Sequence, residues 1–396
     1  MEWITRPLGE ITSYMAKGIP PKYTEEETEN TVRVLNQKCN RNFTISYADS
    51  RIHDCTQKKV PSDKLLKKGD VLINSTGTGT AGRVAQMMEI PIPTTIDGHM
   101  ILLRPSKEID AFYYGYAVKA HQAQIETLAE GSTGQTEINR NRLQTEVMIT
   151  YPEDKKVQAG IASFLRDVDR KIEVNNDVNR NLSRQARAIY NERFGALEKT
   201  KVLNDYPVRI YSGGTPSTTK KEYWENGDIH WLSSGETADE FVITTEKNIT
   251  QLGVDKSSTK WARKYDVVTA SAGQGHTRGQ TTMILLDTCI NQSVIVTHAE
   301  KVYMPFIFFN ISGRYDELRV LSDGTSTRGS LTTKIMAKLG MPDISDEEIK
   351  SFSDYAWPII SQIEVNLKEN NRLAELRDSL LPKLMSGELD VSDLEI

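Results

Sequence analysis

Cysteine is scarce in this chain, and residue patterns for metal binding are missing. The 396 residues include only Cys39, Cys55 and Cys289, with no Cys-x-x-Cys pair. This excludes a disulfide framework and a cysteine zinc site, and we expect the three thiols to be buried small apolar groups. The six histidines have no metal-ligand spacing such as His-Glu-x-x-His. We therefore expect no bound metal.

Long hydrophobic runs are also missing. No run of eighteen apolar residues occurs, and the start of the chain lacks the charged and then apolar pattern of a secretory signal. The sequence therefore predicts a cytoplasmic protein that does not bind membranes. The length allows two or three domains, and 38% hydrophobic with 26% charged residues is typical of folded proteins.

The chain has no overall excess of basic charge. Its net charge is -5, whereas a protein that binds duplex DNA usually shows a basic footprint. The acidic excess lies at the C-terminal end, because residues 343–396 hold 13 acidic and 5 basic side chains. The remainder is weakly positive, so the net charge does not exclude DNA as a partner.

The sequence repeats itself at an offset of 191 to 196 residues. Four pairs of segments match in the same order: Leu8–Glu10 with Leu203–Asp205, Asp70–Gly79 with Asp266–Gly275, Gly131–Gln135 with Gly324–Arg328, and Ile172–Asn175 with Ile363–Asn366. Four matches in one register predict a tandem duplication.

Each half divides into a globular part and a helical part. Strand-like runs such as Val71–Ile73 and Val294–Thr297 predict mixed α/β globules. Helical periodicity takes over near 153–194 and 345–386, and Ser345-Asp-Glu-Glu348 has the pattern of a capping box. The predicted divisions are a globular domain at 1–151, a spacer helix at 152–196, a second globular domain at 197–342, and a helix with a tail at 343–396.

Both helical segments carry a coiled-coil seam, with apolar residues and asparagines at alternating spacings of three and four. The seam residues are Leu165, Ile172, Asn175, Asn179 and Leu182 in the first helix, and Ile359, Ile363, Asn366, Asn370 and Leu373 in the second. Asparagines that face each other would specify register and orientation. We therefore expect the helices to pair as a rod between two similar globules, the alternative being that each packs on its own globule. Trp357-Pro358 predicts a kink or a late start in the second helix.

Two motifs suggest catalysis but fit structural roles better. Gly77-Thr-Gly-Thr-Ala-Gly82 formally matches a dinucleotide-binding fingerprint, but the matching Gly273-Gln-Gly-His-Thr-Arg-Gly279 breaks the spacing. Asp343, Glu348 and Lys350 imitate a metal-dependent nuclease. They lie at a capped helix start, where acids favour the positive end of the helix dipole. We find no catalytic constellation.

The ends of the helices resemble a known family. Residues Leu376–Leu389 closely resemble the closing helix of the specificity (S) subunits of type I restriction-modification enzymes, and residues between Tyr151 and Ile172 resemble their central spacer. Ser212-Gly-Gly-Thr-Pro216 is similar to the start of a target-recognition domain. The first half has Lys17-Gly-Ile-Pro-Pro21 at that place, so we expect this loop to be built differently.

The resemblance implies an α+β fold in which two mixed α/β target-recognition domains are separated by two long antiparallel coiled-coil helices. It implies a noncatalytic subunit in a prokaryotic cytoplasm. Each domain would read one half of an asymmetric bipartite site in double-stranded DNA, and the helices would set the gap. The partners would be two modification (methyltransferase) subunits and the restriction (translocase and nuclease) subunits. S-adenosylmethionine, ATP and Mg would be bound by those partners, and no cofactor by this chain.

Polar stretches at matching places in both halves provide candidate DNA contacts, because base reading needs polar side chains on exposed loops and phosphate binding needs Lys, Arg or backbone N–H groups. In the first half the candidates are Ser75, Thr76, Thr78, Arg83, Thr133, Gln135, Thr136, Asn139, Arg140 and Arg142. In the second half they are Thr218, Lys220, Lys221, Ser271, Gln274, His276, Thr277, Arg278, Thr325, Ser326, Thr327, Arg328 and Lys334. For each residue, the alternative is an ordinary solvated loop position.

Two other functions stay open. A scaffold that bridges proteins without touching DNA would leave the mobility of DNA unchanged even when methyltransferase partners are present. A nucleotide-binding enzyme that uses the loop of Gly77, Gly79 and Gly82 would show saturable nucleotide binding by the isolated chain.

Overall fold

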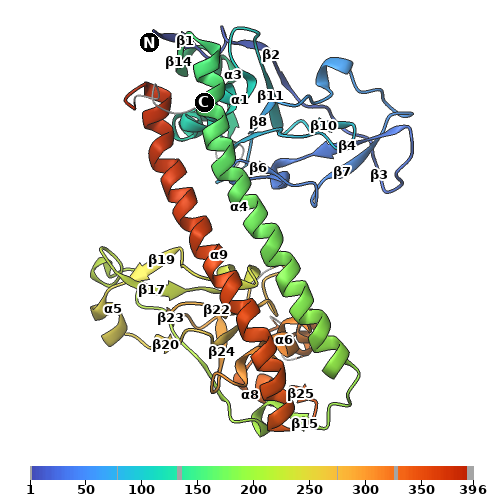
Figure 1. The fold of residues 1–396 in the computed structure, drawn as a ribbon, viewed down its shortest axis with the longest axis vertical. Coiled ribbons are helices and arrows are strands. Elements are labelled where there is room, and N and C mark those ends of the chain that lie inside the picture. The colour runs from blue at the N-terminus through green and yellow to red at the C-terminus, as the bar shows by residue number, and fades with distance from the viewer. Residues whose placement is uncertain (1, 78, 132–135, 274, 325–328, 390–396) are drawn as a thin grey trace. The chain divides into compact units, whose positions relative to one another are not determined.

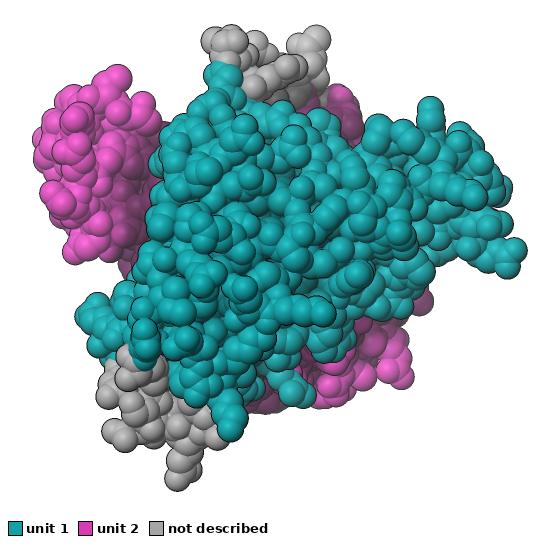
Figure 2. Space-filling model, turned by 90° about the horizontal axis from the view of Figure 1, so that it is seen from above, with its two compact units in different colours: residues 1–171, 373–396 teal, residues 172–372 magenta. Residues whose placement is uncertain are grey.

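A computed structural model describes residues 2–77, 79–131, 136–273, 275–324 and 329–389. The fold is α+β and divides into two compact units, residues 1–171 with 373–396 and residues 172–372, which Figure 2 colours separately. Two long helices, α4 (Lys155–Tyr190) and α9 (Asp346–Ser386), each contribute residues to both units (Figure 1). A π-helical turn at Asn191–Gly195 follows α4.

The first unit contains two four-stranded sheets. The sheet in the order β2-β11-β8-β9 is antiparallel, whereas the sheet in the order β10-β4-β7-β3 pairs β10 parallel to β4. Two-stranded pairs join β1 to β14, β5 to β6 and β12 to β13. The strands are β1 (Trp3–Pro7), β2 (Thr12–Lys17), β3 (Tyr23–Thr24), β4 (Thr31–Leu35), β5 (Asn40–Arg41), β6 (Thr44–Ile45), β7 (Arg51–Asp54), β8 (Val71–Asn74), β9 (Val84–Gln86), β10 (Thr94–Ile96), β11 (Met100–Pro105), β12 (Ala129–Glu130), β13 (Glu137–Ile138) and β14 (Met148–Pro152). The short helices are α1 (Ala111–Ala120), α2 (Gln122–Thr127) and α3 (Arg140–Glu146).

The second unit has a five-stranded sheet in the order β16-β24-β21-β22-β18 and a four-stranded sheet in the order β19-β17-β23-β20. A two-stranded pair joins β15 to β25. The strands are β15 (Lys201–Val202), β16 (Arg209–Ser212), β17 (Ile229–Leu232), β18 (Phe241–Val242), β19 (Lys247–Ile249), β20 (Lys260–Ala262), β21 (Val267–Ala270), β22 (Thr281–Ile284), β23 (Thr288–Ile290), β24 (Val294–His298) and β25 (Gly340–Met341). The short helices are α5 (Gln251–Asp255), α6 (Met304–Ser312), α7 (Tyr315–Asp323) and α8 (Thr333–Ala337).

The two units repeat one strand order. Strands β2, β11, β8 and β9 of the first unit correspond to β16, β24, β21 and β22 of the second. The registers also correspond, because Lys17 pairs with Ile101 in the first unit and Ser212 pairs with Ile295 in the second. The strand-like runs predicted at 71–73 and 294–297 are confirmed as β8 and β24. The shared order supports the duplication inferred from the sequence.

Three tyrosines of α1 fill the core of the first unit. Tyr113, Tyr114 and Tyr116 are fully buried, and a buried hydroxyl needs a hydrogen-bond partner. The Tyr114 hydroxyl lies 2.7 Å from the Thr12 hydroxyl, and the Tyr116 hydroxyl donates to Asp169 Oδ2 of α4 at 2.5 Å. These bonds fix α1 between the sheet and the long helix.

The asparagines of the seam face each other within the second unit. Asn175 Nδ2 donates to Asn370 Oδ1 at 2.8 Å, and Asn366 Nδ2 donates to Asn179 Oδ1 at 2.7 Å. All four side chains are less than 9% exposed. Higher numbers on α4 pair with lower numbers on α9, so the two helices are antiparallel.

The apolar seam positions are buried to different degrees. Leu165, Ile359 and Ile363 are buried, whereas Ile172, Leu182 and Leu373 are half-buried. Within the first unit, Arg377 Nη1 of α9 donates to Asp169 Oδ1 of α4 at 2.6 Å, which continues the antiparallel pairing.

Pro358 lies inside α9, and the predicted late start of this helix is wrong. The helix already begins at Asp346 and continues to Ser386. An interior proline costs about 3 kcal/mol, because it removes one backbone hydrogen bond and crowds the preceding turn. Ile359 and Ile360 are buried in the core of the second unit, and each contributes about 1.5–3 kcal/mol. Burial of the apolar face therefore outweighs the proline.

The predicted capping box and most of the predicted cysteine burial are confirmed. Glu348 N donates to Ser345 Oγ at 3.3 Å, and Ser345 N donates to Glu348 Oε2 at 3.2 Å. Cys39 and Cys289 are buried, whereas Cys55 is only half-buried. In the part of the chain that the structure describes, every helix is too short or too polar to cross a membrane.

Candidate nucleic-acid interface

A glycine loop follows the same strand in each unit. The loops lie between β8 and β9 in the first unit and between β21 and β22 in the second, and both strand pairs are antiparallel. Gly77 and Gly273 have φ of 107° and 146°, which only glycine adopts without strain. The loop of Gly77 leads from β8 into the antiparallel strand β9, whereas a dinucleotide fingerprint must open a helix.

Each glycine loop is bonded to the second polar stretch predicted for its half. Ser75 O accepts a hydrogen bond from Ile138 N at 2.8 Å. In the second unit, Ser271 O accepts from Leu331 N at 2.9 Å. Both serines are buried, so they hold the backbone rather than present a hydroxyl to solvent. The structure therefore brings the two predicted stretches together at equivalent places in both units. In each unit, we call the glycine loop together with the polar stretch that is hydrogen-bonded to it the joined loop.

The loops after β2 and β16 share one backbone hydrogen bond and differ in the one before it, as expected from the different sequence at Lys17–Pro21. Gly18 N donates to Met100 O at 3.1 Å, whereas Gly213 N donates to Asn291 O at 3.3 Å. Ile19 N donates to Ile96 O at 2.9 Å, and Gly214 N donates to Ile290 O at 3.2 Å. The two sequences differ, but a glycine at the same place lets the same backbone bond form.

Asn139 and Arg142 have internal partners. The Asn139 side chain caps α3 by accepting from Asn141 N at 3.0 Å. Arg142 donates to Glu130 Oε1 at 2.8 Å and to Glu146 Oε1 at 2.7 Å. The hydrogen bonding of Arg142 to Glu146 lowers the pKa of that carboxyl group below its usual range. Two carboxylates already compensate the charge of Arg142, which leaves it little net attraction for a phosphate.

Two further predicted arginines hold their own loops. Arg83 Nη2 donates to Gly79 O across the first glycine loop at 3.1 Å. Arg278 is buried, donates to Gly329 O at 3.1 Å and forms an ion pair with Asp323. Arg278 therefore joins the second glycine loop to the segment that precedes α8.

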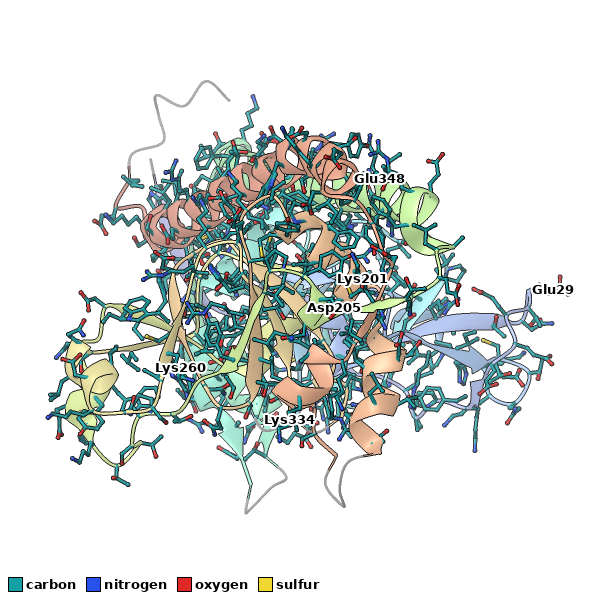
Figure 3. The ribbon with its side chains drawn as sticks, turned by 90° about the horizontal axis from the view of Figure 1, so that it is seen from below. Glu29, Lys201, Asp205, Lys260, Lys334 and Glu348 are labelled. Carbon is teal, nitrogen blue, oxygen red and sulfur yellow. The ribbon has the colours of Figure 1, made fainter. Side chains whose placement is uncertain are left out.

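The remaining described candidates differ in exposure. Thr76, Thr136 and Thr277 are half-buried, and Arg140, His276 and Lys334 are exposed. Figure 3 labels Lys334, which lies on α8. The other candidates, Thr78, Thr133, Gln135, Gln274, Thr325, Ser326, Thr327 and Arg328, lie outside the described residues.

Thr218, Lys220 and Lys221 are exposed and belong to a different part of the second unit. Thr218 lines a pocket with Trp224, Lys247 and Asn248. Among the described residues, no hydrogen bond or ion pair joins these three candidates to the second glycine loop. The structure therefore does not unite them with Ser271.

Sequence reasoning missed two polar residues of the first joined loop. Gln37 Nε2 donates to Thr76 Oγ1 at 2.8 Å, and His99 Nδ1 lies 3.1 Å from the same hydroxyl. His99 directly precedes β11, which pairs antiparallel with β8. Its place beside the end of β8 could have been expected from that pairing, whereas the contact of Gln37 depends on a distant loop.

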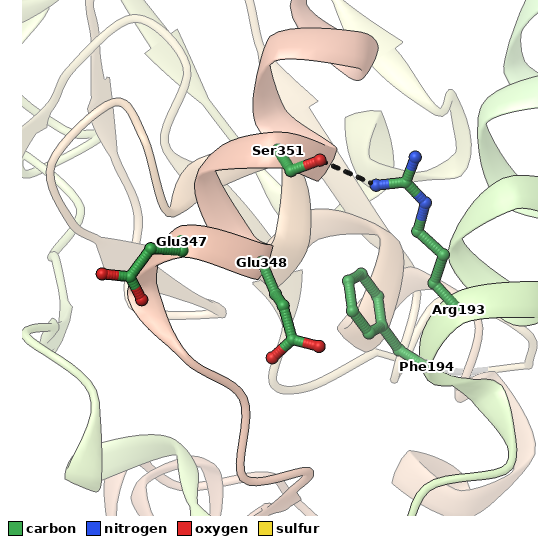
Figure 4. Close-up of a pocket in the computed structure, with 5 residues that line it drawn as sticks. All are labelled: Arg193, Phe194, Glu347, Glu348 and Ser351. Atoms are coloured by element: carbon green, nitrogen blue, oxygen red, sulfur yellow. Dashed lines mark hydrogen bonds between the residues drawn. The ribbon is translucent and has the colours of Figure 1, made fainter.

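The nuclease-like residues have structural partners. Asp343 forms an ion pair with Lys201 at 2.5 Å, and Glu348 belongs to the capping box. Figure 4 shows Glu348 in a pocket beside Phe194, where Arg193 donates to Ser351 Oγ at 3.2 Å. Within the described ranges, no group of three or more His, Cys, Asp or Glu side chains could hold a metal ion.

Comparisons with known proteins agree on one family. Residues 1–184 match the type I restriction modification DNA specificity domain. The specificity subunit of the MjaIX type I restriction enzyme from Methanocaldococcus jannaschii is 22% identical, over 99% of this chain and 95% of that subunit. The EcoR124I/EcoR124II specificity subunit of Escherichia coli is 29% identical over 35% of each chain.

A solved structure shows the same fold. The S subunit of a type I restriction-modification system from M. genitalium has a TM-score of 0.57 and 17% identity, and the match covers 99% of this chain and 97% of that subunit. This likeness concerns the fold alone. The domain match over residues 1–184 and the relative aligned along the whole chain make this chain similar to the specificity subunits of type I restriction-modification enzymes, which are noncatalytic components of those complexes.

Proposed function

We propose that this chain reads an asymmetric, bipartite site in double-stranded DNA, with one half-site for each unit. The observation that carries this proposal is the repeated bonding of the joined loops, Ser75 to Ile138 and Ser271 to Leu331. A shared backbone that carries different side chains suits the reading of two different sequences.

The exposed residues of the joined loops are the proposed DNA contacts. Arg140, His276 and Lys334 present side chains to solvent, and such groups bind phosphates or base edges. Thr76 and Thr277, which are half-buried, offer hydroxyl groups in the two glycine loops. Ser75, Ser271, Asn139, Arg142 and Arg278 are assigned to holding the loops rather than to touching DNA.

The proposed domains are 1–151 and 197–342 for recognition, with spacers at 152–196 and 343–396. The paired helices would set the gap between the half-sites, and the asparagine layers would fix their register. The chain would recruit two modification subunits and the restriction subunits in the prokaryotic cytoplasm. Those partners would bind S-adenosylmethionine, ATP and Mg.

A domain exchange tests the division of labour. Residues 1–151 are replaced by those of another specificity subunit, and the methylated DNA motif of the host is determined by sequencing. We expect one half-site to change and the other to stay the same. A change in both half-sites, or in neither, would contradict the proposal.

A scaffold that does not touch DNA is the competing function. It predicts that the complex of this chain with its methyltransferase subunits changes the mobility of DNA no more than those subunits do alone. We expect instead a gain of sequence-selective binding that weakens with salt, because phosphate contacts release counterions.

A further inference from the structure

An ion pair beside the first joined loop is replaced by two serines at the equivalent places of the second unit. Lys17, the last residue of β2, forms a salt bridge with Glu137, the first residue of β13. Ser212 stands at the place of Lys17, because both pair with the equivalent isoleucine of the neighbouring strand. Ser330 stands at the place of Glu137, because it directly precedes Leu331, as Glu137 precedes Ile138.

Glu137 lies against the glycine loop. It forms a β-bridge with Thr76, and Ser75 Oγ donates to Glu137 Oε1 at 3.5 Å. The side chains of Glu137 and Lys17 are 42% and 33% exposed, and the salt bridge also uses Oε1. Among the described residues, Oε2 accepts no hydrogen bond. The neighbours thus orient the carboxylate, and the side chain stays exposed enough to reach a ligand.

Stability alone is a weak explanation for this pair. A salt bridge between partly exposed side chains contributes little, because water and salt screen it. A carboxylate near DNA is repelled by the phosphates, so a neutral residue would suit a surface that only follows the backbone. A carboxylate is favoured where it accepts a hydrogen bond from the amino group of a base, as in Glu or Asp paired with cytosine N4.

We propose that Glu137, held by Lys17, is a specificity-determining residue of the first unit that accepts a hydrogen bond from an exocyclic amino group, cytosine N4 or adenine N6. The inference rests on the proposed DNA-reading function and deepens it. The serines at the equivalent places in the second unit can both donate and accept, so that unit does not make the same selection. The two units thus share a scaffold but differ in the side chains at this place.

The test replaces the pair by the residues that the chain itself uses in the second unit. Lys17→Ser with Glu137→Ser is introduced into the full-length chain in its native host, and the methylated motif is read by sequencing. We expect one cytosine or adenine position of one half-site to accept other bases, with at least about a tenfold loss of preference there. The base that the wild-type motif requires at this position shows whether Glu137 contacts cytosine N4 or adenine N6.

Two further variants complete the experiment. Glu137→Gln keeps the size of the side chain but adds a donor, and we expect it to alter the same motif position. Arg6→Ser with Glu108→Ser removes another exposed ion pair of the first unit, of 3.2 Å, and we expect it to leave the motif unchanged.

The outcomes separate this inference from the proposed function. If the wild-type chain directs no methylation motif, the DNA-reading function itself fails. If it directs one, the inference is overturned when both Glu137 variants keep that motif unchanged. Equal loss of methylation at all sites, or complete loss of methylation with both variants, also overturns it. A lost base contact should relax the sequence preference at one position rather than remove methylation.

Discussion

Glycine at positions 18 and 213 is required by the carbonyl groups that face it. A Cβ atom at Gly18 would lie 2.1 Å from Asp97 O, and one at Gly213 would lie 2.2 Å from Ile290 O. We expect Gly18→Ala and Gly213→Ala each to lower the free energy of unfolding by about 2–3 kcal/mol, as measured by urea denaturation. Gly98→Ala is the control, because its nearest neighbour would be 3.8 Å away. Equal stability of all three variants would contradict the argument.

Glu317 on α7 should make the second unit sensitive to acid. Hydrogen bonds from Arg314, with a smaller effect of Lys199, lower the pKa of Glu317 to about 2 from an ordinary value of 4.5. The stabilisation is therefore fully present above pH 4.5 and is lost as the pH falls towards 2. We expect Glu317→Gln to destabilise the protein at pH 6 and much less at pH 3, as measured by urea denaturation. A pH-independent effect of Glu317→Gln would refute the assignment.

Residue types and matching positions predicted where the joined loops lie, but not which of their side chains are free of internal partners and so available to DNA. The sequence does not show that Asn139 caps α3, because the cap depends on where that helix begins. It does not show that Arg142 is shared between Glu130 and Glu146, because the contact with Glu130 bridges twelve residues. Assigning a polar residue to DNA therefore required its internal partners to be known.

The asparagine layers between α4 and α9 should cost stability in exchange for register. Asn179 Nδ2 is buried and has no partner among the described residues, and an unsatisfied buried donor costs about 1–3 kcal/mol. We expect Asn179→Leu with Asn366→Leu to raise the free energy of unfolding by about 1–2 kcal/mol. Asn366→Leu alone should lower it, because Asn179 then loses its partner. Thermal unfolding of the full chain measures both effects, and destabilisation by the double variant would argue against the layer as a costly register device.

The long helices were predictable because their signal is local and repeated. Spacings of three and four placed the seam, and the Ser345 and Glu348 pattern placed the start of α9. The continuation through Pro358 was not predictable from the same pattern, because it depends on the core that buries Ile359 and Ile360. The strand order of the two units also follows from non-local pairing, which the repeats indicated without specifying.

At the scale of the whole molecule, the length of the paired helices should determine the gap between the half-sites. Deleting residues 173–179 and 366–372 removes one heptad from each helix and preserves the seam on either side. Seven helical residues span about 10.5 Å, which corresponds to about three base pairs of DNA. We expect the methylated motif to keep both half-sites and to lose about three base pairs of gap. Altered half-sites with an unchanged gap would contradict the spacer role.

The central claim is that this chain determines which DNA sequence a type I modification complex methylates. The most direct measurement is to sequence the methylated bases of the host genome with and without the gene for this chain. The account predicts that one bipartite adenine-methylation motif disappears with the gene and returns when the gene is restored. An identical pattern of methylation in both strains would contradict it.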